Sequence, residues 1–364
     1  MKRSIASVCA ALALVLTAAL PATAAQTARP RAVPAGVPVA CGDVVTTDAY
    51  LAADLHCTDG VGLTLLESVT LDLNGHRLVG PGREAGGVAV TYDQGKPVTV
   101  TNGTITGWWV GVAASEDSAP SSTPSTLTKL TFTDSGTAVR AFQAGYDISW
   151  SRFARNDVAV NGFSSLPVSV SRSSFTDGGI DVASTRLTIA DSSFLRAPVS
   201  CTDGGLDVVR SSFARASGAA ISQDDCNGST VRNSLFTGNG TAYISFASPS
   251  VPDELTGNTF LANTVALEPR AGAVVRDSLF LRNTQAVVIP ADFTGAATYT
   301  VERSTFTRNV DAVQIEAVAS LRSVRATSNS GWGIYAPNAV DLGGNVAYGN
   351  GKDPQCVGVS CSVR

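Results

Sequence analysis

Histidine is scarce in this sequence: His56 and His76 are the only two histidines in 364 residues. Because a serine hydrolase needs a base beside its nucleophile, the many serines of the chain do not indicate a Ser-His enzyme. The sequence also contains no zinc-type spacing of cysteine and histidine, no glycine-rich phosphate loop and no G-x-S-x-G motif. These absences argue against zinc enzymes, nucleotide-dependent enzymes and α/β-hydrolases.

Lysine is scarce as well, and the chain is acidic. It has 26 basic and 30 acidic residues, a formal net charge of −4. Without residues 1–24, which contain Lys2 and Arg3, 24 basic residues face 30 acidic ones, a formal charge of −6. No basic stripe is present, so we expect no nucleic-acid partner. Such a protein would also repel acidic glycans unless a local basic patch or a metal intervened.

Long apolar runs are missing except at the N-terminus. Residues 1–24 combine a charged start, an apolar run and the small residues Ala22-Thr23-Ala24. This pattern is typical of a secretory signal peptide, and the run is too short for a membrane helix. We therefore expect a secreted, extracellular protein with no membrane span, in which residues 25–40 form a Pro/Ala-rich spacer.

A repeat runs through nearly all of the remaining chain. It is marked by a phenylalanine in short segments such as "SSFTDGGIDV" and "SLFLRNTQAVVI", and successive phenylalanines are 19 to 26 residues apart. The marked positions are Phe132, Phe153, Phe175, Phe194, Phe213, Phe236, Phe260, Phe280 and Phe306. Degenerate units at both ends bring the total to about 13, and a period near 20 residues indicates a solenoid.

Each unit holds short alternating runs rich in Val, Ile, Thr and Phe, separated by Gly, Asn, Asp and Ser. This pattern indicates strands and turns rather than helices. We expect an all-β, single-domain parallel β-helix over residues 63–338, with the phenylalanines stacked inside. Residues 41–62 are expected to form an N-terminal cap, and residues 339–364 a C-terminal coil and cap.

Asparagine recurs three residues after the phenylalanine in many units. Asparagine tolerates the left-handed backbone of a sharp turn, and stacked side chains can hydrogen-bond from coil to coil. We expect such a ladder at Asn156, Asn239, Asn263, Asn283, Asn309, Asn329 and Asn350.

The segment "TLDLNGHRLVGPG", Thr70 to Gly82, lies in the first coils of this repeat. With the repeat, it resembles secreted bacterial proteins of the right-handed parallel β-helix, or pectin-lyase-like, superfamily. The resemblance implies right-handed winding and a substrate groove along one strand face. It does not imply one activity, because the superfamily includes lyases, hydrolases, epimerases and proteins with no known activity.

Six cysteines remain after the signal peptide, an even number that suits an oxidising compartment. Sequence alone permits 15 pairings. Closure between near neighbours in the chain favours Cys41–Cys57, Cys201–Cys226 and Cys356–Cys361.

Asp203, Asp224 and Asp225 are candidate catalytic residues. They lie in "TDGGLD" and "QDDC", which resemble the N-T-D-G and D-D-C motifs of polygalacturonases. In that family, one carboxylic acid protonates the leaving oxygen while other carboxylates activate water. The family's G-H-G and R-x-K motifs have no counterpart here, and 21 residues is simply one coil. The alternative, which these departures favour, is that the aspartates are turn residues braced by Cys201–Cys226.

A lyase would need a base and a cation beside a uronate carboxylate. Arg270 beside Glu268 is the candidate pair, and Ca²⁺ bound by aspartate oxygens is the one metal hypothesis. No cofactor motif is evident. A solvated surface of mixed charge is the alternative.

Aromatic side chains could stack on sugar rings. Trp109, Phe246 and Tyr335 are the candidates, with Glu268 as a polar neighbour. Trp109 could instead pack under the loop from Ser115 to Ser125, the largest interruption of the repeat.

Two functions stay open from the sequence. One is a secreted protein that binds or acts on extracellular polysaccharide as a lyase or glycoside hydrolase. The other is a non-catalytic extracellular rod for structure or binding. We expect a monomer in either case.

Overall fold

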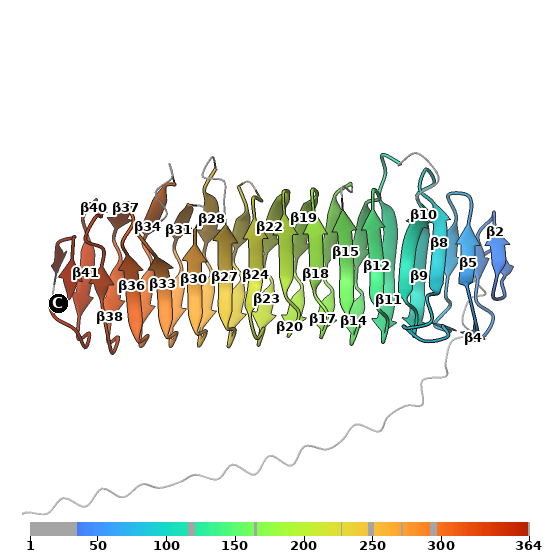
Figure 1. Ribbon diagram of the computed structural model, residues 1–364, viewed down its shortest axis with the longest axis horizontal. Helices are drawn as coiled ribbons and strands as arrows, with labels where there is room; N and C mark the ends of the chain where they lie inside the picture. The colour runs from blue at the N-terminus through green and yellow to red at the C-terminus, as the bar shows by residue number, and fades with distance from the viewer. Residues whose placement is uncertain are drawn as a thin grey trace, which may run out of the picture. The chain divides into compact units, whose positions relative to one another are not determined.

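The computed structural model describes residues 35–115, 121–163, 166–226, 228–246, 251–270, 272–291 and 297–362. The predicted signal peptide, residues 1–24, and the first part of the predicted spacer lie outside these residues. The described residues form strands and no helix, as expected from the sequence. They wind as a parallel β-solenoid of about 14 turns, close to the predicted 13 (Figure 1).

Each complete coil contributes one strand to each of three parallel sheets, in the order sheet 1, sheet 2, sheet 3. Sheet 1 has 15 strands, stacked in chain order. They are β2 (Asp43–Val45), β5 (Val61–Leu65), β8 (Val88–Asp93), β10 (Val110–Ser115), β12 (Thr137–Phe142), β15 (Val158–Phe163), β18 (Ile180–Ala183), β21 (Val199–Thr202), β24 (Ala219–Asp224), β27 (Thr241–Phe246), β30 (Val265–Pro269), β33 (Gln285–Ile289), β36 (Asp311–Ile315), β39 (Ile334–Tyr335) and β42 (Cys356–Val357).

Sheets 2 and 3 are joined because β9 and β11 are long enough to belong to both. Sheet 2 contains β1 (Val37–Pro38), β3 (Ala49–Tyr50), β6 (Thr70–Asp72), β9 (Thr99–Thr106), β11 (Ser125–Thr133), β13 (Tyr146–Ser149), β16 (Val168–Ser171), β19 (Arg186–Ala190), β22 (Gly205–Val209), β25 (Thr230–Arg232), β28 (Asp253–Thr256), β31 (Ala273–Arg276), β34 (Tyr299–Glu302), β37 (Ala319–Arg322) and β40 (Val340–Asp341).

Sheet 3 shares β9 and β11 and consists mostly of three-residue strands. Its other members are β4 (Leu55–His56), β7 (Arg77–Val79), β14 (Arg152–Ala154), β17 (Ser174–Thr176), β20 (Ser193–Leu195), β23 (Ser212–Ala214), β26 (Leu235–Thr237), β29 (Thr259–Leu261), β32 (Leu279–Leu281), β35 (Thr305–Thr307), β38 (Arg325–Thr327), β41 (Asn345–Tyr348) and β43 (Cys361–Ser362).

The predicted phenylalanine stack forms the inner side of sheet 3. The middle residue of each short strand points inward, so one phenylalanine per coil enters the core. Neighbouring rings from Phe132 to Phe306 are 4.5–5.0 Å apart between centroids and within 10° of parallel. Each fully buried ring contributes about 1.5–3 kcal/mol, which makes this stack a main stabilising element of the solenoid.

The asparagine ladder is also confirmed, but its backbone conformation differs from the prediction. The Asn263 side-chain amide donates to the Oδ1 atom of Asn283 at 3.0 Å and to the carbonyl of Phe236 at 3.2 Å. The left-handed residue is the one before each asparagine, such as Arg282 with φ 57°. The asparagine itself faces inward, where its amide donates to a phenylalanine carbonyl of an earlier coil.

All three predicted disulfides are present: Cys41–Cys57, Cys201–Cys226 and Cys356–Cys361. Cys201 belongs to β21, and Cys226 follows β24 of the next coil, so this bridge ties adjacent coils together. The first and last bridges lie near the two ends of the solenoid.

Candidate functional site

The outward side of sheet 1 carries two rows of side chains, because alternate residues of each strand point away from the core. The first row runs through Thr91, Ala113, Arg140, Asn161, Asp181, Ser200, Ser222, Ile244, Glu268, Val288, Gln314 and Tyr335. The second row runs through Asp93, Ser115, Phe142, Phe163, Ala183, Thr202, Asp224 and Phe246. Most of the predicted site residues lie in or next to these rows.

The three aspartates lie at the corner between sheets 1 and 2. Asp203 and Asp225 occupy the same left-handed turn position in adjacent coils, with φ 49° and 56°, and Asp224 ends β24. The amide of Asp203 donates to the carbonyl of Asp224 at 2.9 Å. Among the described residues, their carboxylates form no hydrogen bond or ion pair. The turn explains why aspartate occurs at Asp203 and Asp225, and a catalytic role for the three stays a prediction.

A buried carboxylate that sequence reasoning missed lies behind this corner. Asp253, the first residue of β28, points into the core and is 2% exposed. It accepts a hydrogen bond from the Gln223 side chain at 2.8 Å, and Gln223 in turn accepts one from the amide of Cys226 at 3.0 Å. Burial raises the pKa of Asp253 to about 6. These contacts brace the turn that carries Cys226, so the group is structural.

Arg270 and Glu268 do come together with Phe246. The Arg270 guanidinium forms an ion pair with Glu268, with Nε at 2.9 Å from Oε1, and its Cζ atom lies 5.0 Å from the centroid of the Phe246 ring. The Arg270 carbonyl accepts a hydrogen bond from the hydroxyl of Tyr299 at 3.0 Å. Asp224 pairs in register with Phe246, so an acid, an aromatic ring and an ion pair follow one another along the face.

A pocket of about 380 Å³ lies farther along the same face. The rings of Trp332 and Tyr335 are 4.9 Å apart between centroids, and the Lys352 ammonium lies 5.0 Å from the Trp332 ring. The other lining residues are Val288, Ile289, Pro290, Gln314 and Glu316. Tyr335 was predicted from the sequence, whereas Trp332 was missed although "GWGIY" places it three residues earlier.

Trp109 does not join this group. It lies just before β10, is 47% exposed, and has the Arg140 guanidinium 5.9 Å from its ring centroid. Sheet 1 places β10 and β39 ten strands apart. Residues 116–120 of the loop that could have covered Trp109 lie outside the described residues.

Within the ranges that the structure describes, no group of three or more His, Cys, Asp or Glu side chains could hold a metal ion. These residues therefore provide no such cluster of ligands for the hypothesised Ca²⁺. The described part of the chain also contains no helix that is long and apolar enough to cross a membrane.

A sequence model of the family described as "Right handed beta helix region" matches residues 86–250, which agrees with the parallel winding. No curated protein matches the sequence.

Solved structures with a similar winding include polysaccharide-acting enzymes. A mutant of the periplasmic alginate epimerase AlgG is 15% identical, with 83% of this chain and 77% of that chain covered and a TM-score of 0.46. The A-module of the mannuronan C-5 epimerase AlgE6 from Azotobacter vinelandii is 13% identical, with coverages of 86% and 91% and a TM-score of 0.42. The catalytic domain of a GH87 alpha-1,3-glucanase in complex with tetrasaccharides is 10% identical, with coverages of 82% and 64% and a TM-score of 0.39. Similarities at this level assign no activity to this chain.

Proposed function

We propose that this right-handed β-helix protein binds an extracellular polysaccharide along the outward face of sheet 1, from Asp224 to Tyr335. The face is continuous there, because β24, β27, β30, β33, β36 and β39 are successive neighbours. At about 4.8 Å per coil, these strands span about 24 Å, a length that suits a short run of sugar residues.

The observation that carries the proposal is the pocket formed by Trp332 and Tyr335. Both side chains are half-buried, so part of each ring remains exposed to solvent. Sugar rings have apolar C–H faces that pack on aromatic rings, and their hydroxyls bond to amides and carboxylates. Gln314 and Glu316 line the same pocket and supply such groups.

The Arg270–Glu268 pair and Phe246 extend this surface three and four coils from Tyr335 toward the N-terminus. The ion pair holds the guanidinium over the Phe246 ring, which leaves a flat, partly apolar platform with polar edges. A platform of this kind suits a second sugar contact.

The charge of the face favours a neutral glycan. From Asp224 to Tyr335, Asp224, Glu268 and Glu316 contribute three carboxylates, against the cations Arg270 and Lys352. A surplus of negative charge disfavours polyanions.

Binding tests the proposal directly. The purified protein is titrated by calorimetry with a panel of neutral and acidic polysaccharides. We expect at least one neutral polymer to bind, and Trp332→Ala or Tyr335→Ala to weaken that binding about 5-fold, since a lost stacking contact is worth about 1 kcal/mol.

Tyr348→Ala is the matched control. Tyr348 lies on β41 in sheet 3, with the Arg325 guanidinium 5.3 Å from its ring, so it is a stacked tyrosine on another face. Equal losses for Tyr335→Ala and Tyr348→Ala, or no binding to any polymer, would contradict the proposal.

A further inference from the structure

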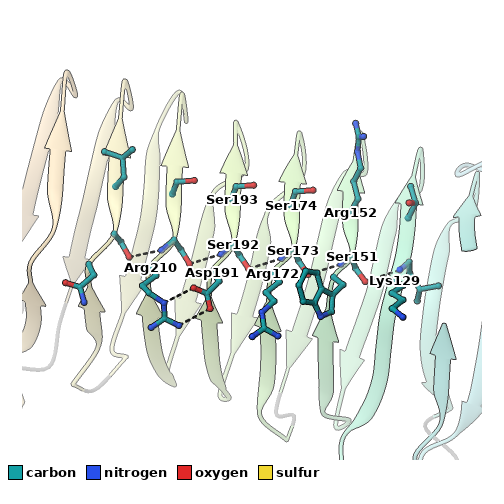
Figure 2. A pocket seen from close by; sticks show the side chains of 18 of the residues that line it. Lys129, Ser151, Arg152, Arg172, Ser173, Ser174, Asp191, Ser192, Ser193 and Arg210 are labelled. Atoms are coloured by element: carbon teal, nitrogen blue, oxygen red, sulfur yellow. Dashed lines mark hydrogen bonds and ion pairs between the residues drawn. The ribbon is translucent and has the colours of Figure 1, made fainter. Parts of the chain in front are cut away.

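A second surface lies at the other end of sheet 2 from the corner that carries the aspartates. It is a groove of about 1110 Å³ at the corner between sheets 2 and 3 (Figure 2). Its residues come from seven successive coils, from Lys129 on β11 to Thr259 on β29. Neither the sequence-predicted site residues nor the sugar-binding face proposed above contribute to it.

The floor of the groove is a ladder of serines. In five successive coils, from Trp150 to Asn233, the left-handed residue is followed by a serine whose hydroxyl accepts a hydrogen bond from an amide of the preceding coil. The amide of Ser151 donates to Ser173 Oγ at 3.1 Å, and the amide of Ser173 donates to Ser192 Oγ at 3.2 Å. Because the floor satisfies its own polar groups, it is rigid, and binding depends on the side chains along its two walls.

Those walls carry three cations in three successive coils. Lys129, Arg152 and Arg172 are exposed, and none of them forms an ion pair with a carboxylate of the described residues. Figure 2 shows Arg152 on one side of the serine ladder and Lys129 and Arg172 on the other. Trp150 lies between them in the chain, is 58% exposed, and has the Arg172 guanidinium 5.0 Å from its ring centroid.

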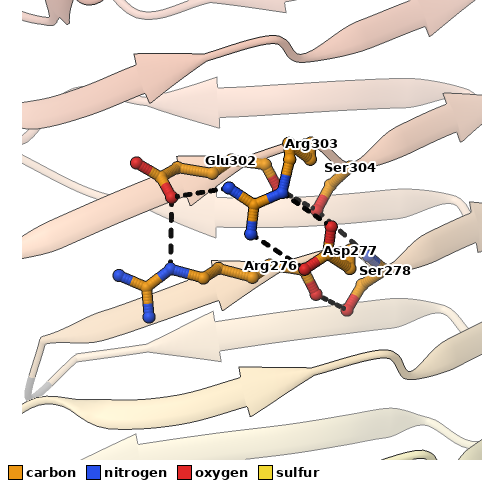
Figure 3. A network of polar contacts seen from close by, with 6 residues as sticks. All are labelled: Arg276, Asp277, Ser278, Glu302, Arg303 and Ser304. Carbon is orange, nitrogen blue, oxygen red and sulfur yellow. Dashed lines mark hydrogen bonds and ion pairs between the residues drawn. The ribbon is translucent and has the colours of Figure 1, made fainter.

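Farther along the solenoid, the arginines at the same corner are paired with carboxylates. Arg303 donates to both carboxylate oxygens of Asp277, at 2.8 and 2.9 Å, and Glu302 accepts from Arg276 at 3.1 Å and from Arg303 at 3.3 Å (Figure 3). Within the groove, Arg210 is paired with Asp191 in the same way. The corner therefore pairs its arginines with carboxylates in several coils, whereas Lys129, Arg152 and Arg172 form no ion pair with a described carboxylate and only Arg172 lies within electrostatic reach of one, Asp191.

We propose that this groove binds a linear acidic polysaccharide. The three cations attract carboxylates that repeat along such a chain, and the exposed face of Trp150 can pack on a sugar ring. The outward hydroxyls of Ser174, Ser193 and Ser212 continue the row of Arg152 along the groove and suit sugar hydroxyls. The chain as a whole is acidic, with a net charge of −4, so the attraction is local. Nucleic acid fits less well, because it calls for a basic surface longer than three cations.

Calorimetry with polygalacturonate, neutral dextran and single-stranded oligo-dT tests this inference. The probes are titrated into the wild-type protein and into the Trp332→Ala/Tyr335→Ala background, so that sheet 1 cannot mask the result. We expect both proteins to bind polygalacturonate, and dextran not to bind in that background. The triple variant Lys129→Gln/Arg152→Gln/Arg172→Gln should bind polygalacturonate about 10- to 100-fold more weakly.

The matched control is Arg155→Gln/Arg196→Gln/Arg303→Gln. It removes the same three charges from exposed arginines that are paired with Asp134, Asp177 and Asp277. It should retain binding within about 3-fold. The inference is overturned if the two triple variants lose affinity equally, if the wild-type protein does not bind polygalacturonate, or if oligo-dT binds more tightly. Loss of polygalacturonate binding in the Trp332→Ala/Tyr335→Ala background would assign it to sheet 1 instead.

Discussion

Asp203 and Asp225 hold the same left-handed turn position in adjacent coils, with φ 49° and 56°. Their spacing of 22 residues is thus the spacing of one coil at a corner that tolerates few residue types. The pattern that resembles a catalytic motif has a sufficient backbone explanation. Only substitution can separate the two interpretations.

The aspartates and Arg270 give the first prediction. If they are not catalytic, then Asp203→Asn, Asp225→Asn and Arg270→Gln leave any activity of the protein unchanged. A polysaccharide panel, with and without Ca²⁺, measures absorbance of unsaturated uronates and, separately, new reducing ends. New reducing ends that are abolished by Asp224→Asn would instead establish a hydrolase, and absorbance lost with Arg270→Gln a lyase.

The same turn predicts a stability difference. Asp203→Asn keeps a side chain that tolerates φ near 50°, whereas Asp203→Val brings a β-branched residue into that conformation at a cost of about 1–2 kcal/mol. Thermal unfolding should show a lower midpoint for the valine variant and little change for the asparagine variant. Equal midpoints would mean that the turn relaxes to accommodate valine.

The phenylalanine stack predicts a larger effect. Phe194 is 2% exposed and stacks on Phe175 and Phe213, with centroids at 4.5 and 4.7 Å. Phe194→Ala should destabilise the protein by about 3–5 kcal/mol, because a cavity opens in the middle of the stack. Phe163→Ala, at a phenylalanine that is 50% exposed, is the control and should cost far less in denaturant unfolding.

Asp253 predicts a specific dependence on pH. Burial raises its pKa from 3.8 to about 6 in the folded protein, so the folded state binds its proton more tightly than the unfolded state. The contribution of this group to stability is therefore largest below pH 4 and is lost as the pH rises to about 6. The full shift corresponds to about 3 kcal/mol.

Asp253→Asn removes this titration but keeps the shape of the side chain. The stability of the variant relative to the wild type should rise by up to about 3 kcal/mol between pH 4 and pH 7, measured by urea unfolding at each pH. An unchanged difference over this range would show that the Asp253 carboxyl titrates alike in both states.

The disulfide that joins adjacent coils gives the last prediction. Cys201 and Cys226 are 25 residues apart, so the bridge restricts the unfolded chain by about 3 kcal/mol in the loop-entropy description. Cys201→Ala/Cys226→Ala should lower the unfolding midpoint more than Cys356→Ala/Cys361→Ala, because the second loop closes over only five residues. The reverse order would show that the end bridge protects the solenoid against unfolding from its terminus.

The sequence by itself determined the solenoid, the inward phenylalanines, the asparagine ladder and the three disulfides. The solenoid, the phenylalanines and the asparagine ladder follow from one local rule: residues at equal positions in successive repeats stack, and the repeat can be read along the chain. The disulfides were predicted for another reason, closure between near neighbours in the chain. The period of two within each strand then decides which side chain is buried.

Only the tertiary structure decided which outward side chains meet. Coil lengths vary between 19 and 26 residues. The sequence therefore aligns successive coils near the repeated phenylalanine, but it does not show which residues of the variable turns lie beside one another. For that reason Trp332 was not grouped with Tyr335, and Lys129, Arg152 and Arg172 were not recognised as one groove. Likewise, nothing in "PSVPDELTG" distinguishes Asp253 from an exposed polar residue. Its burial becomes visible only in the structure, where it contacts Gln223 of an earlier coil. The sequence analysis assigned both the left-handed backbone and the inward amide to the asparagine. In the structure the asparagine supplies the inward amide, and the residue before it adopts the left-handed backbone.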